Sequence, residues 1–419
     1  MQKKIIALAV AGLVSGAAFA QSNVTIYGVA DAGFVNSSGD RNGNVNKGNA
    51  NFSGIQSGIL AGSRIGFKGE EGLGNGLKAV FTLEYNLNID DNSGIGSGNT
   101  YAGPSTAALG AATNTIATGL QARQQFVGLN HAKLGTVALG RQYNPGYGAS
   151  ARNDAMVSSA AASSTEVLRA ASGTRIAAAT SARVNNAVTY TSPNWSGFTA
   201  SAIYGYGETG NNAAGTVGVS SATAAGNGVG QGSDGQFGAG LNYANGPLNI
   251  DVLYVTLQNR STAGPTVAAR PVGVAGANAA SATAAQSRDS VNEWMLAGTY
   301  DFKIVKLYAS YQDLNDKNGT SAMDMSNKLW NIGATMPVFA NGTVRAMYSD
   351  LSWDRTGAGD SKSWSLGYTH AMSKRTTLYT TYTHTDNDKN ALVAAGSVAS
   401  TRSLGESSAT ITAGLNHTF

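Results

Sequence analysis

Apolar and polar residues alternate with a period of two along most of the chain, and this pattern limits the possible folds more than any other feature. It is clearest in 407–419, where Ile411 and Leu415 lie on one face and Thr410 and Thr412 on the other. A period of two is that of a β-strand, whose successive side chains point to opposite sides of the sheet. One face is aliphatic or aromatic, and the other is small and rich in hydroxyl groups. Such strands suit a sheet with hydrocarbon on one side and water on the other.

Sixteen segments show this alternation and are the predicted strands. They lie at 23–35, 57–69, 77–89, 121–129, 135–143, 184–192, 197–206, 236–245, 247–259, 290–302, 304–314, 326–336, 341–353, 361–371, 375–386 and 407–419. The connections alternate in length, and the long ones fall at 36–56, 90–120, 144–182, 207–235, 260–289, 315–325, 354–360 and 387–406. Short turns at one end and long loops at the other are typical of a membrane barrel and not of a soluble β-sandwich. We therefore predict an all-β fold, a transmembrane 16-stranded antiparallel β-barrel.

The composition favours a barrel at a water–lipid boundary over a soluble enzyme. Charged residues make up 12% of the chain and hydrophobic residues 42%, yet the mean hydropathy is −0.13. A soluble enzyme of this size normally carries about twice that share of charge. The absence of cysteine excludes disulfide scaffolds and thiolate metal sites. We expect no cofactor.

The first twenty residues predict export. Lys3 and Lys4 precede the apolar run Ile5–Val14, and Ala18-Phe19-Ala20 forms a small-x-small cleavage site. The apolar run is too short to span a membrane as a helix, which needs about 20 residues. We expect a signal peptide at 1–20 and a barrel domain at 21–419. Removing the two lysines lowers the formal net charge from +4 to +2, which gives no argument for nucleic acid as a partner.

Motifs that would indicate an enzyme are weak. Residues Gly230–Gly235 match the G-x-G-x-x-G pattern, but they precede a predicted strand, whereas a dinucleotide site needs the motif between a strand and a helix. The four histidines are scattered, without an H-E-x-x-H sequence or clustered carboxylates. We expect no enzymatic activity and no metal site. A barrel enzyme, such as a membrane phospholipase or protease, remains conceivable but would normally use fewer strands.

Four stretches carry a family pattern: Val24–Gly33, Ser63–Ala79, Phe126–Leu129 and Leu134–Gln142. They resemble the general-diffusion porins of Gram-negative bacteria, most closely those of the β-proteobacterial and neisserial type. The final residue, Phe419, resembles the terminal aromatic residue by which such barrels are handed to the barrel assembly machinery.

The resemblance implies a homotrimer in the outer membrane, exported through the periplasm and in contact with outer-membrane lipid and lipopolysaccharide. It implies passive diffusion of small hydrophilic solutes and ions without energy coupling. The third long loop, here 144–182, would fold into the barrel and narrow the pore. Arginines of the wall would face acidic groups of that loop across the constriction.

Three arginines match the family's wall positions by their motifs, namely Arg64, Arg141 and Arg183. A charge that faces lipid at the midplane costs about 2–4 kcal/mol, so wall charges should point into the lumen. The alternation of the strands places Arg64, Lys68 and Arg183 on the lumen side, and Lys78 is assigned to the lumen as well.

Arg141 does not follow the simple alternation, because it shares the parity of Val137 and Leu139. Either a bulge follows Gly140 or Arg141 lies at the end of its strand. The resemblance alone keeps it at the predicted constriction.

The predicted inward loop holds two carboxylates, Asp154 and Glu166, against the bases Arg152, Arg169 and Arg175. Which carboxylate faces the wall arginines stays open. Because bases outnumber acids, we predict a weak preference for anions through the focusing of the field in a narrow aqueous channel. The loop arginines could equally be solvated or paired locally.

Aromatic residues could form a stacking track for sugars, but an aromatic girdle at the two membrane interfaces is the favoured interpretation. The residues that could form either are Tyr27, Trp195, Trp294, Trp330, Trp353 and Trp364.

Three other functions compete with a general-diffusion porin. A substrate-selective porin would show a lumen track of aromatic residues and paired charges. A surface adhesin of barrel form would bind a partner through its long loops and conduct poorly. A soluble secreted β-protein would be extracted without detergent.

Overall fold

The computed structural model describes residues 23–39, 51–90, 122–207, 232–258, 261–262, 286–287, 290–316, 325–355, 357–391, 393 and 405–419. The predicted signal peptide and large parts of the predicted long loops lie outside the described residues. The segment 144–182 and the short turns lie within them.

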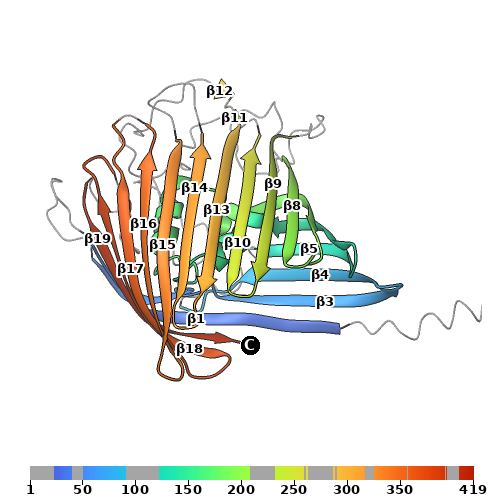
Figure 1. The fold of residues 1–419 in the computed structure, drawn as a ribbon, viewed down its shortest axis with the longest axis horizontal. Coiled ribbons are helices and arrows are strands. Elements are labelled where there is room, and N and C mark those ends of the chain that lie inside the picture. Colours follow the sequence, from blue (N-terminus) through green and yellow to red (C-terminus); the bar gives the residue numbers. More distant parts are fainter. Residues whose placement is uncertain are drawn as a thin grey trace, which may run out of the picture.

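The strands begin and end close to the predicted positions (Figure 1). Their bounds are β1 Asn23–Gly39, β2 Phe52–Ser57, β3 Arg64–Gly74, β4 Leu77–Asn86, β5 Ala122–His131, β6 Gly135–Tyr143, β7 Arg183–Thr191, β8 Phe198–Gly207, β9 Gly232–Asn245, β10 Leu248–Leu257, β11 Ser261–Thr262, β12 Gln286–Ser287, β13 Val291–Asp301, β14 Lys306–Asn315, β15 Asn327–Val338, β16 Gly342–Trp353, β17 Ser361–Ala371, β18 Thr376–Asn387 and β19 Ser408–Thr418. The small strands β11 and β12 pair only with each other.

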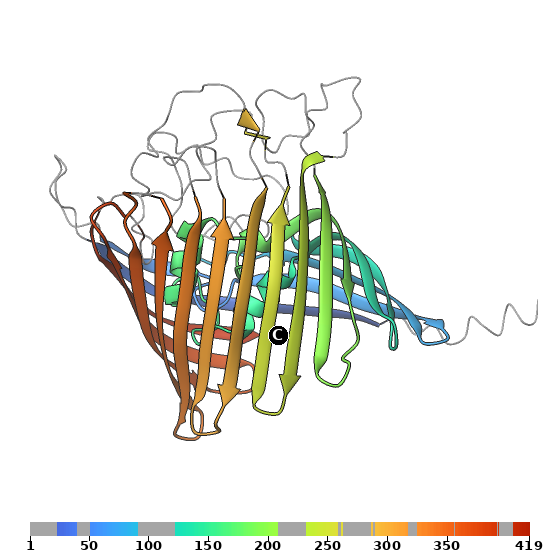
Figure 2. The same cartoon turned by 45° about the horizontal axis from the view of Figure 1, so that its top comes forward.

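The large sheet closes on itself as an antiparallel barrel. Successive strands of this sheet are paired, except that β2 and β3 both pair with β1, and β1 pairs with β19 over Val29–Gly39. The backbone N–H groups of Gly28 and Phe419 each donate to the other's carbonyl oxygen, at 3.1 and 3.2 Å. Closure satisfies the backbone groups of both edge strands, as a sheet in hydrocarbon requires. The short turns gather at the lower end of the barrel in Figure 2.

The second barrel strand differs from its prediction, because 57–69 is not continuous. Strands β2 and β3 pair with consecutive stretches of β1, so they form one strand that is interrupted between Ser57 and Arg64. Counted in this way, the closed sheet contains sixteen strands among the described residues. Gly58 turns the chain out of the ladder with a φ of 72°, a left-handed value that glycine adopts without steric cost.

The alternation seen in the sequence is the alternation of the two barrel faces. In β17, Ser361, Ser363 and Ser365 are buried on the inside, whereas Trp364 and Leu366 are exposed on the outside. The outward apolar side chains would meet lipid, and the inward side chains meet each other or the chain inside the barrel.

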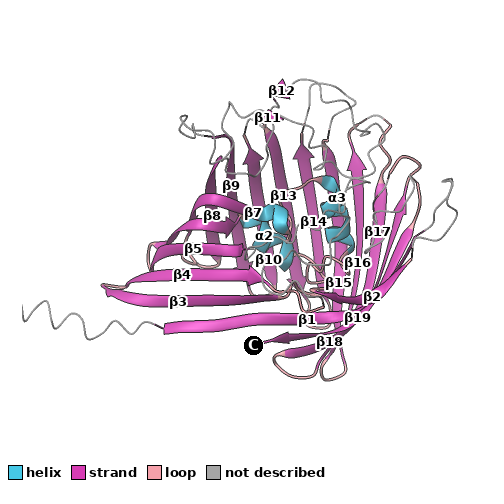
Figure 3. Ribbon diagram, turned by 180° about the vertical axis from the view of Figure 1, so that it is seen from behind, coloured by secondary structure: helices cyan, strands magenta, loops and turns pink. Residues whose placement is uncertain are grey.

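The segment between β6 and β7 lies inside the barrel (Figure 3). It contains α2 (Pro145–Arg152), α3 (Ser164–Ser172) and the short 3-10 helix η2 (Thr180–Ala182). Leu168 packs with Leu329 and Leu351, side chains from the inner faces of β15 and β16. No helix in the described part of the chain is both long enough and apolar enough to cross a membrane.

Three tryptophans of the predicted girdle are exposed on the outside of β13, β15 and β17, namely Trp294, Trp330 and Trp364. Two residues of that prediction lie elsewhere. Tyr27 points inward, where its hydroxyl donates to Glu84 at 3.0 Å, and Trp353 packs against the inner cluster of Leu351. The aromatic type alone therefore did not distinguish the lipid face from the lumen.

Candidate pore constriction

Four arginines project from one side of the barrel, which we call the arginine wall (β3 to β7). Arg64 begins β3 and Arg183 begins β7, while Arg123 and Arg141 lie in β5 and β6. The positive charges of Arg123 and Arg141 act on Arg183, which places these three guanidinium groups near each other. Arg64 and Arg123 meet at a shared carboxylate, that of Glu84.

Two of these arginines lie at β-bulges. The ladder of β4 and β5 shifts in register beside Glu84, so that Arg123 is the extra residue between the paired positions. The ladder of β6 and β7 shifts after Gly140, whose φ is 133°, and here the extra residue belongs to β7, where Asn185 and Asn186 stand opposite Arg141. A bulge bends the strand and re-aims a side chain. This explains why simple parity did not place Arg141, and a bulge after Gly140 was one of the two predicted explanations.

Glu84 holds two of the wall arginines, Arg123 and Arg64, in place. Its carboxylate accepts from the Nε of Arg123 at 2.7 Å and from the hydroxyls of Tyr27 and Tyr143 at 3.0 and 3.2 Å. The Nε of Arg64 lies 3.7 Å from the same carboxylate. Because the side chains of Glu84 and Arg123 are 6% and 4% exposed, neither can exchange its partner for bulk water. Removing one member of such a buried pair costs about 3–5 kcal/mol.

A pair of tyrosines links the arginines to the inner loop. The rings of Tyr143 and Tyr147 stack with centroids 3.7 Å apart and an interplanar angle of 4°. Arg123 donates from Nη2 to the Tyr147 hydroxyl at 3.0 Å, and the guanidinium of Arg183 lies 5.8 Å from the centre of the Tyr143 ring. The start of α2 is therefore fixed against the wall arginines.

Arg141 and the two predicted lumen lysines have separate contacts. The Nε of Arg141 donates to the Ala122 carbonyl at 3.0 Å, and its Nη1 contacts Asn185. The Nζ of Lys68 lies 5.2 Å from the centre of the Tyr27 ring, on the same face as Glu84. Lys78 lies near the short turn and pairs with Glu70 at 2.7 Å, with both side chains about half exposed, so it belongs to the rim more than to the arginine cluster.

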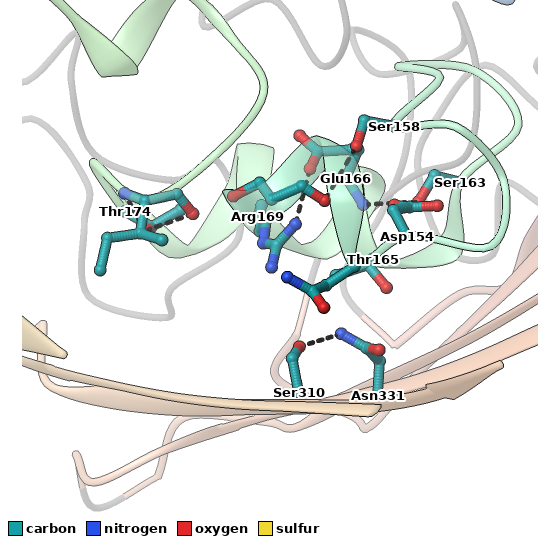
Figure 4. A network of polar contacts seen from close by, with 12 residues as sticks. Asp154, Ser158, Ser163, Thr165, Glu166, Arg169, Thr174, Ser310 and Asn331 are labelled. Carbon is teal, nitrogen blue, oxygen red and sulfur yellow. Dashed lines mark hydrogen bonds and ion pairs between the residues drawn. The ribbon is translucent and has the colours of Figure 1, made fainter. Parts of the chain in front are cut away.

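The two loop carboxylates are buried and paired within the loop (Figure 4). Asp154 accepts from the Ser163 hydroxyl and from the Met156 backbone N–H, and Glu166 accepts from Nη1 of Arg169 at 2.8 Å. Within the described residues, neither makes an ion pair with Arg64, Arg141 or Arg183. The structure thus places them inside the loop and leaves the wall arginines facing other groups.

Burial raises the pKa of both carboxyls. For Asp154 the hydrogen bond from Ser163 and the charge of Arg169 act in the opposite direction. For Glu166 the charge of Arg169 also lowers the pKa, while the neighbouring Asp154 raises it further. Their carboxyl groups therefore take up protons more readily than exposed ones.

The barrel wall, not the loop, supplies the carboxylates that join loop and wall. Asp251 of β10 accepts from Nη2 of Arg152 at 2.6 Å and from the Asn153 amide at 2.7 Å. Glu293 of β13 accepts from the Thr174 hydroxyl and from the Arg175 backbone N–H at 2.8 Å. Both wall carboxylates are 1% exposed. They anchor the two ends of the inner segment to the same side of the barrel.

This site is electrostatic. No group of three or more His, Cys, Asp or Glu side chains that could hold a metal ion occurs within the described ranges. A profile of the Gram-negative porins matches residues 7–390. The chain belongs to the Gram-negative porin family.

Relatives of this porin span its whole length. It is 29% identical over 431 residues to outer membrane porin protein 32 of Delftia acidovorans, with all of both chains covered. It is 27% identical to an outer membrane porin protein of Bordetella pertussis, covering 90% of this chain and 93% of that one. Its fold matches the anion-selective porin from Comamonas acidovorans with a TM-score of 0.68 and 23% identity, covering 95% of this chain and 100% of that one. This porin is thus an outer-membrane barrel that forms a channel for passive diffusion.

Several residues of the site were missed in the sequence, and for one of them the signal was present. Glu84 shares the parity of Thr82 and Asn86 and opposes Leu83 and Tyr85, so alternation alone would have placed it in the lumen. Arg123 could not be found in this way, because its bulge reverses its parity relative to Val127.

Proposed function

We propose that this porin favours anions and that the arginine wall sets this preference. The observation that carries the proposal is the charge of the wall cluster, in which Arg64 and Arg123 share the carboxylate of Glu84 and the charges of Arg123 and Arg141 act on Arg183. Charges of one sign beside a narrow aqueous path bounded by low-dielectric walls concentrate ions of the opposite sign. The anion selectivity named for the Comamonas protein supports the same preference here.

The loop strengthens the imbalance. The negative charge of Glu166 is matched by Arg169 at 2.8 Å, and both side chains are almost fully buried. Arg152 pairs with Asp251, but its own side chain remains 47% exposed. The loop thus presents an exposed base to the lumen and keeps its acids covered. A passing anion would meet arginines from the wall and from the loop.

The segment 144–182 would act as the constriction that limits solute size. It occupies the lumen between the arginine wall and the inner faces of β10 and β13 to β16, where its apolar side chains are packed. Solutes must pass beside it. We propose the homotrimer as the working assembly, on the family resemblance, and lipopolysaccharide and the barrel assembly machinery as its partners in the membrane.

The test is ion selectivity in a planar bilayer, with protein purified from outer membranes. Stepwise conductance followed by the reversal potential in a salt gradient would show an open channel that favours anions. Replacing Arg64 by glutamine should shift the reversal potential toward zero, because one fixed positive charge is lost near the path. The control is Arg375→Gln, the same charge change in the short turn between β17 and β18.

Three results would contradict the proposal in different ways. Inserted protein without conductance would move the function to the external loops, as in an adhesin. Saturable block of the current by one solute class would indicate a substrate-selective porin. A reversal potential that favours cations, or that responds equally to Arg64→Gln and Arg375→Gln, would show that the arginine wall does not control selectivity.

A further inference from the structure

The interruption of the second barrel strand forms a small structure of its own, Gly58–Ser63, which we call the ledge. It leaves the ladder at Gly58, whose backbone N–H donates to the Asp31 carbonyl at 2.8 Å, and rejoins it at Arg64. Its side chains Ile59 and Leu60 are buried, at 0% and 8% exposure. The ledge is therefore an ordered part of the barrel interior.

The Asp31 side chain holds the ledge to the barrel seam, the place where β1 pairs with β19. Its carboxylate is fully buried and accepts five hydrogen bonds. The donors are the backbone N–H groups of Ile59, Leu60 and Ala61 at 2.8, 3.2 and 3.3 Å, the Tyr379 hydroxyl at 3.0 Å and the Asn416 amide at 2.8 Å. Three donors thus come from the ledge, and the other two come from β18 and β19. A buried carboxylate with this many donors fixes the groups around it.

One side of the ledge contacts the inner loop. The hydroxyl of Ser159 donates to the Ile59 carbonyl at 2.5 Å. Ala161 packs with Ile59, Leu60 and Tyr379 in one buried apolar cluster. The turn of the loop before α3 therefore rests on the ledge.

The other side of the ledge contacts the arginine wall. The Nη1 of Arg64 donates to the Gly62 carbonyl at 3.0 Å, while its Nε faces Glu84 at 3.7 Å. The position of this guanidinium is thus determined by two groups, one of which belongs to the ledge. A shift of the ledge would move Arg64 and the loop together.

We propose that Asp31 is a positioning residue of the pore, which sets the location of Arg64 and of the inner loop through the ledge. Asp31 itself is buried and does not meet the solute. The inference rests on the proposed role of Arg64 and the loop in selectivity. It adds that their geometry is fixed from the seam where β1 meets β19.

The test compares Asp31→Asn, Arg64→Gln and the double variant. Asparagine keeps the shape of the side chain, but its amide nitrogen cannot accept from the N–H groups that face it. We expect Asp31→Asn to increase open-channel current noise and to shift the reversal potential toward zero by at least half of the Arg64→Gln shift. In the double variant the two shifts should not add, because Asp31→Asn acts by displacing the Arg64 guanidinium and Arg64→Gln removes that same group.

Matched variants separate positioning from general loss of stability. Ser37→Ala removes another buried seam contact, the 2.8 Å hydrogen bond to Thr410, without touching the ledge. It should leave noise and reversal potential unchanged. Ser159→Ala should raise the current noise with little effect on selectivity, because it loosens only the loop side of the ledge.

Each outcome decides the inference. If Arg64→Gln shifts the reversal potential but folded Asp31→Asn does not, or if their shifts add, the positioning role is wrong while the proposed selectivity stands. If Arg64→Gln has no effect, the proposed selectivity itself fails. Should Asp31→Asn not assemble, Tyr379→Phe removes one donor to the same carboxylate. Unchanged currents in both Tyr379→Phe and Ser159→Ala would then overturn the inference.

Discussion

The arginine wall (β3 to β7) and the opposite side of the barrel share the same alternating strand pattern, but they differ in the regularity of their ladders and in their inward side chains. The ladders from β13 to β19 contain no register shift, and many small hydroxyl-bearing side chains are buried along their inner face. We call β13 to β18 the hydroxyl wall, after the buried inward residues Ser310, Ser349, Ser363, Ser365, Thr381 and Thr383. The ladders between β3 and β7 shift beside Glu84 and after Gly140.

The size of the inward side chains explains where the strand ladders are regular and where they shift. Hydroxyls on the hydroxyl wall pair across the strands, as Ser363 with Thr385 at 3.0 Å and Thr381 with Thr412 at 2.6 Å. Such short side chains need no adjustment of the backbone. Guanidinium groups are larger and must reach shared partners, and bulges supply that freedom. Two register shifts therefore lie at the charged site, whereas the ladders that support α3 contain none.

The largest expected effect is a reversal of selectivity on the arginine wall. Changing both Arg141 and Arg183 to glutamate would leave Arg64 and Arg123 against three carboxylates. We expect the reversal potential to change sign from anion to cation preference. The same substitutions at Lys374 and Arg375, in the turn after β17, should have little effect, because salt screens charges beyond about 10 Å. An unchanged sign in the first variant would show that these arginines lie away from the ion path.

The next effect concerns stability and contrasts the two walls directly. Glu84→Gln leaves Arg123 buried without its ion-pair partner, and we expect a loss of about 3–5 kcal/mol in unfolding free energy. On the hydroxyl wall, Ser363→Ala removes two neutral hydrogen bonds, to the His384 carbonyl and the Thr385 hydroxyl, and should cost about 1–2 kcal/mol. Urea unfolding in detergent measures both. Equal losses would mean that Glu84 is not the anchor of the arginine wall.

The outer faces of the two walls should behave alike. Leu139 on β6 and Ile332 on β15 are 57% and 55% exposed and lie near the middle of their strands. Arginine at either position would face hydrocarbon and should cost about 2–4 kcal/mol. Folding titrations into lipid vesicles test this. A much smaller loss at Leu139 alone would show that the outside of the arginine wall does not meet lipid.

The smallest effect is a pH dependence of the inner loop. Because burial raises the pKa of Asp154 and Glu166, the folded loop binds protons more tightly than the unfolded chain. Its packing should therefore be most stable in acid and weaken as the pH rises through these raised pKa values. Protease sensitivity of the loop across that range measures the trend. Asp154→Asn should reduce the slope, and a rise in stability with pH would contradict the assignment.

Alternation made the barrel predictable, since each strand carries two faces that differ in chemistry and the strand bounds follow from where the alternation stops. It failed where the backbone leaves the ladder. The ledge was predicted to be continuous strand, because Ser57–Gly69 still reads as mixed polar and apolar residues. Arg123 was hidden by a bulge that only the three-dimensional pairing reveals.

The bounds of the segment 144–182 between β6 and β7 agree with the sequence prediction, but the internal structure of this segment was not predicted. A signal for α3 was present, because Ser163 and Glu166 have the spacing of a capping box and Gly173 ends the helix in a left-handed conformation. The pairing of Glu166 with Arg169 follows from that helix, since they lie three residues apart on it. The contacts of Asp251 and Glu293 with the loop depend on tertiary packing and have no local signature.

The pairing of β1 with β19 has a consequence for the order of biosynthesis. The first strand to leave the ribosome finds its outer partner only when the last strand has been made, since Ser37 and Thr410 are 373 positions apart. Until then β1 has one backbone edge without its partner, and such an edge invites pairing with other chains. A cell that makes this porin must keep a nearly complete polypeptide apart from its copies until the final segment arrives.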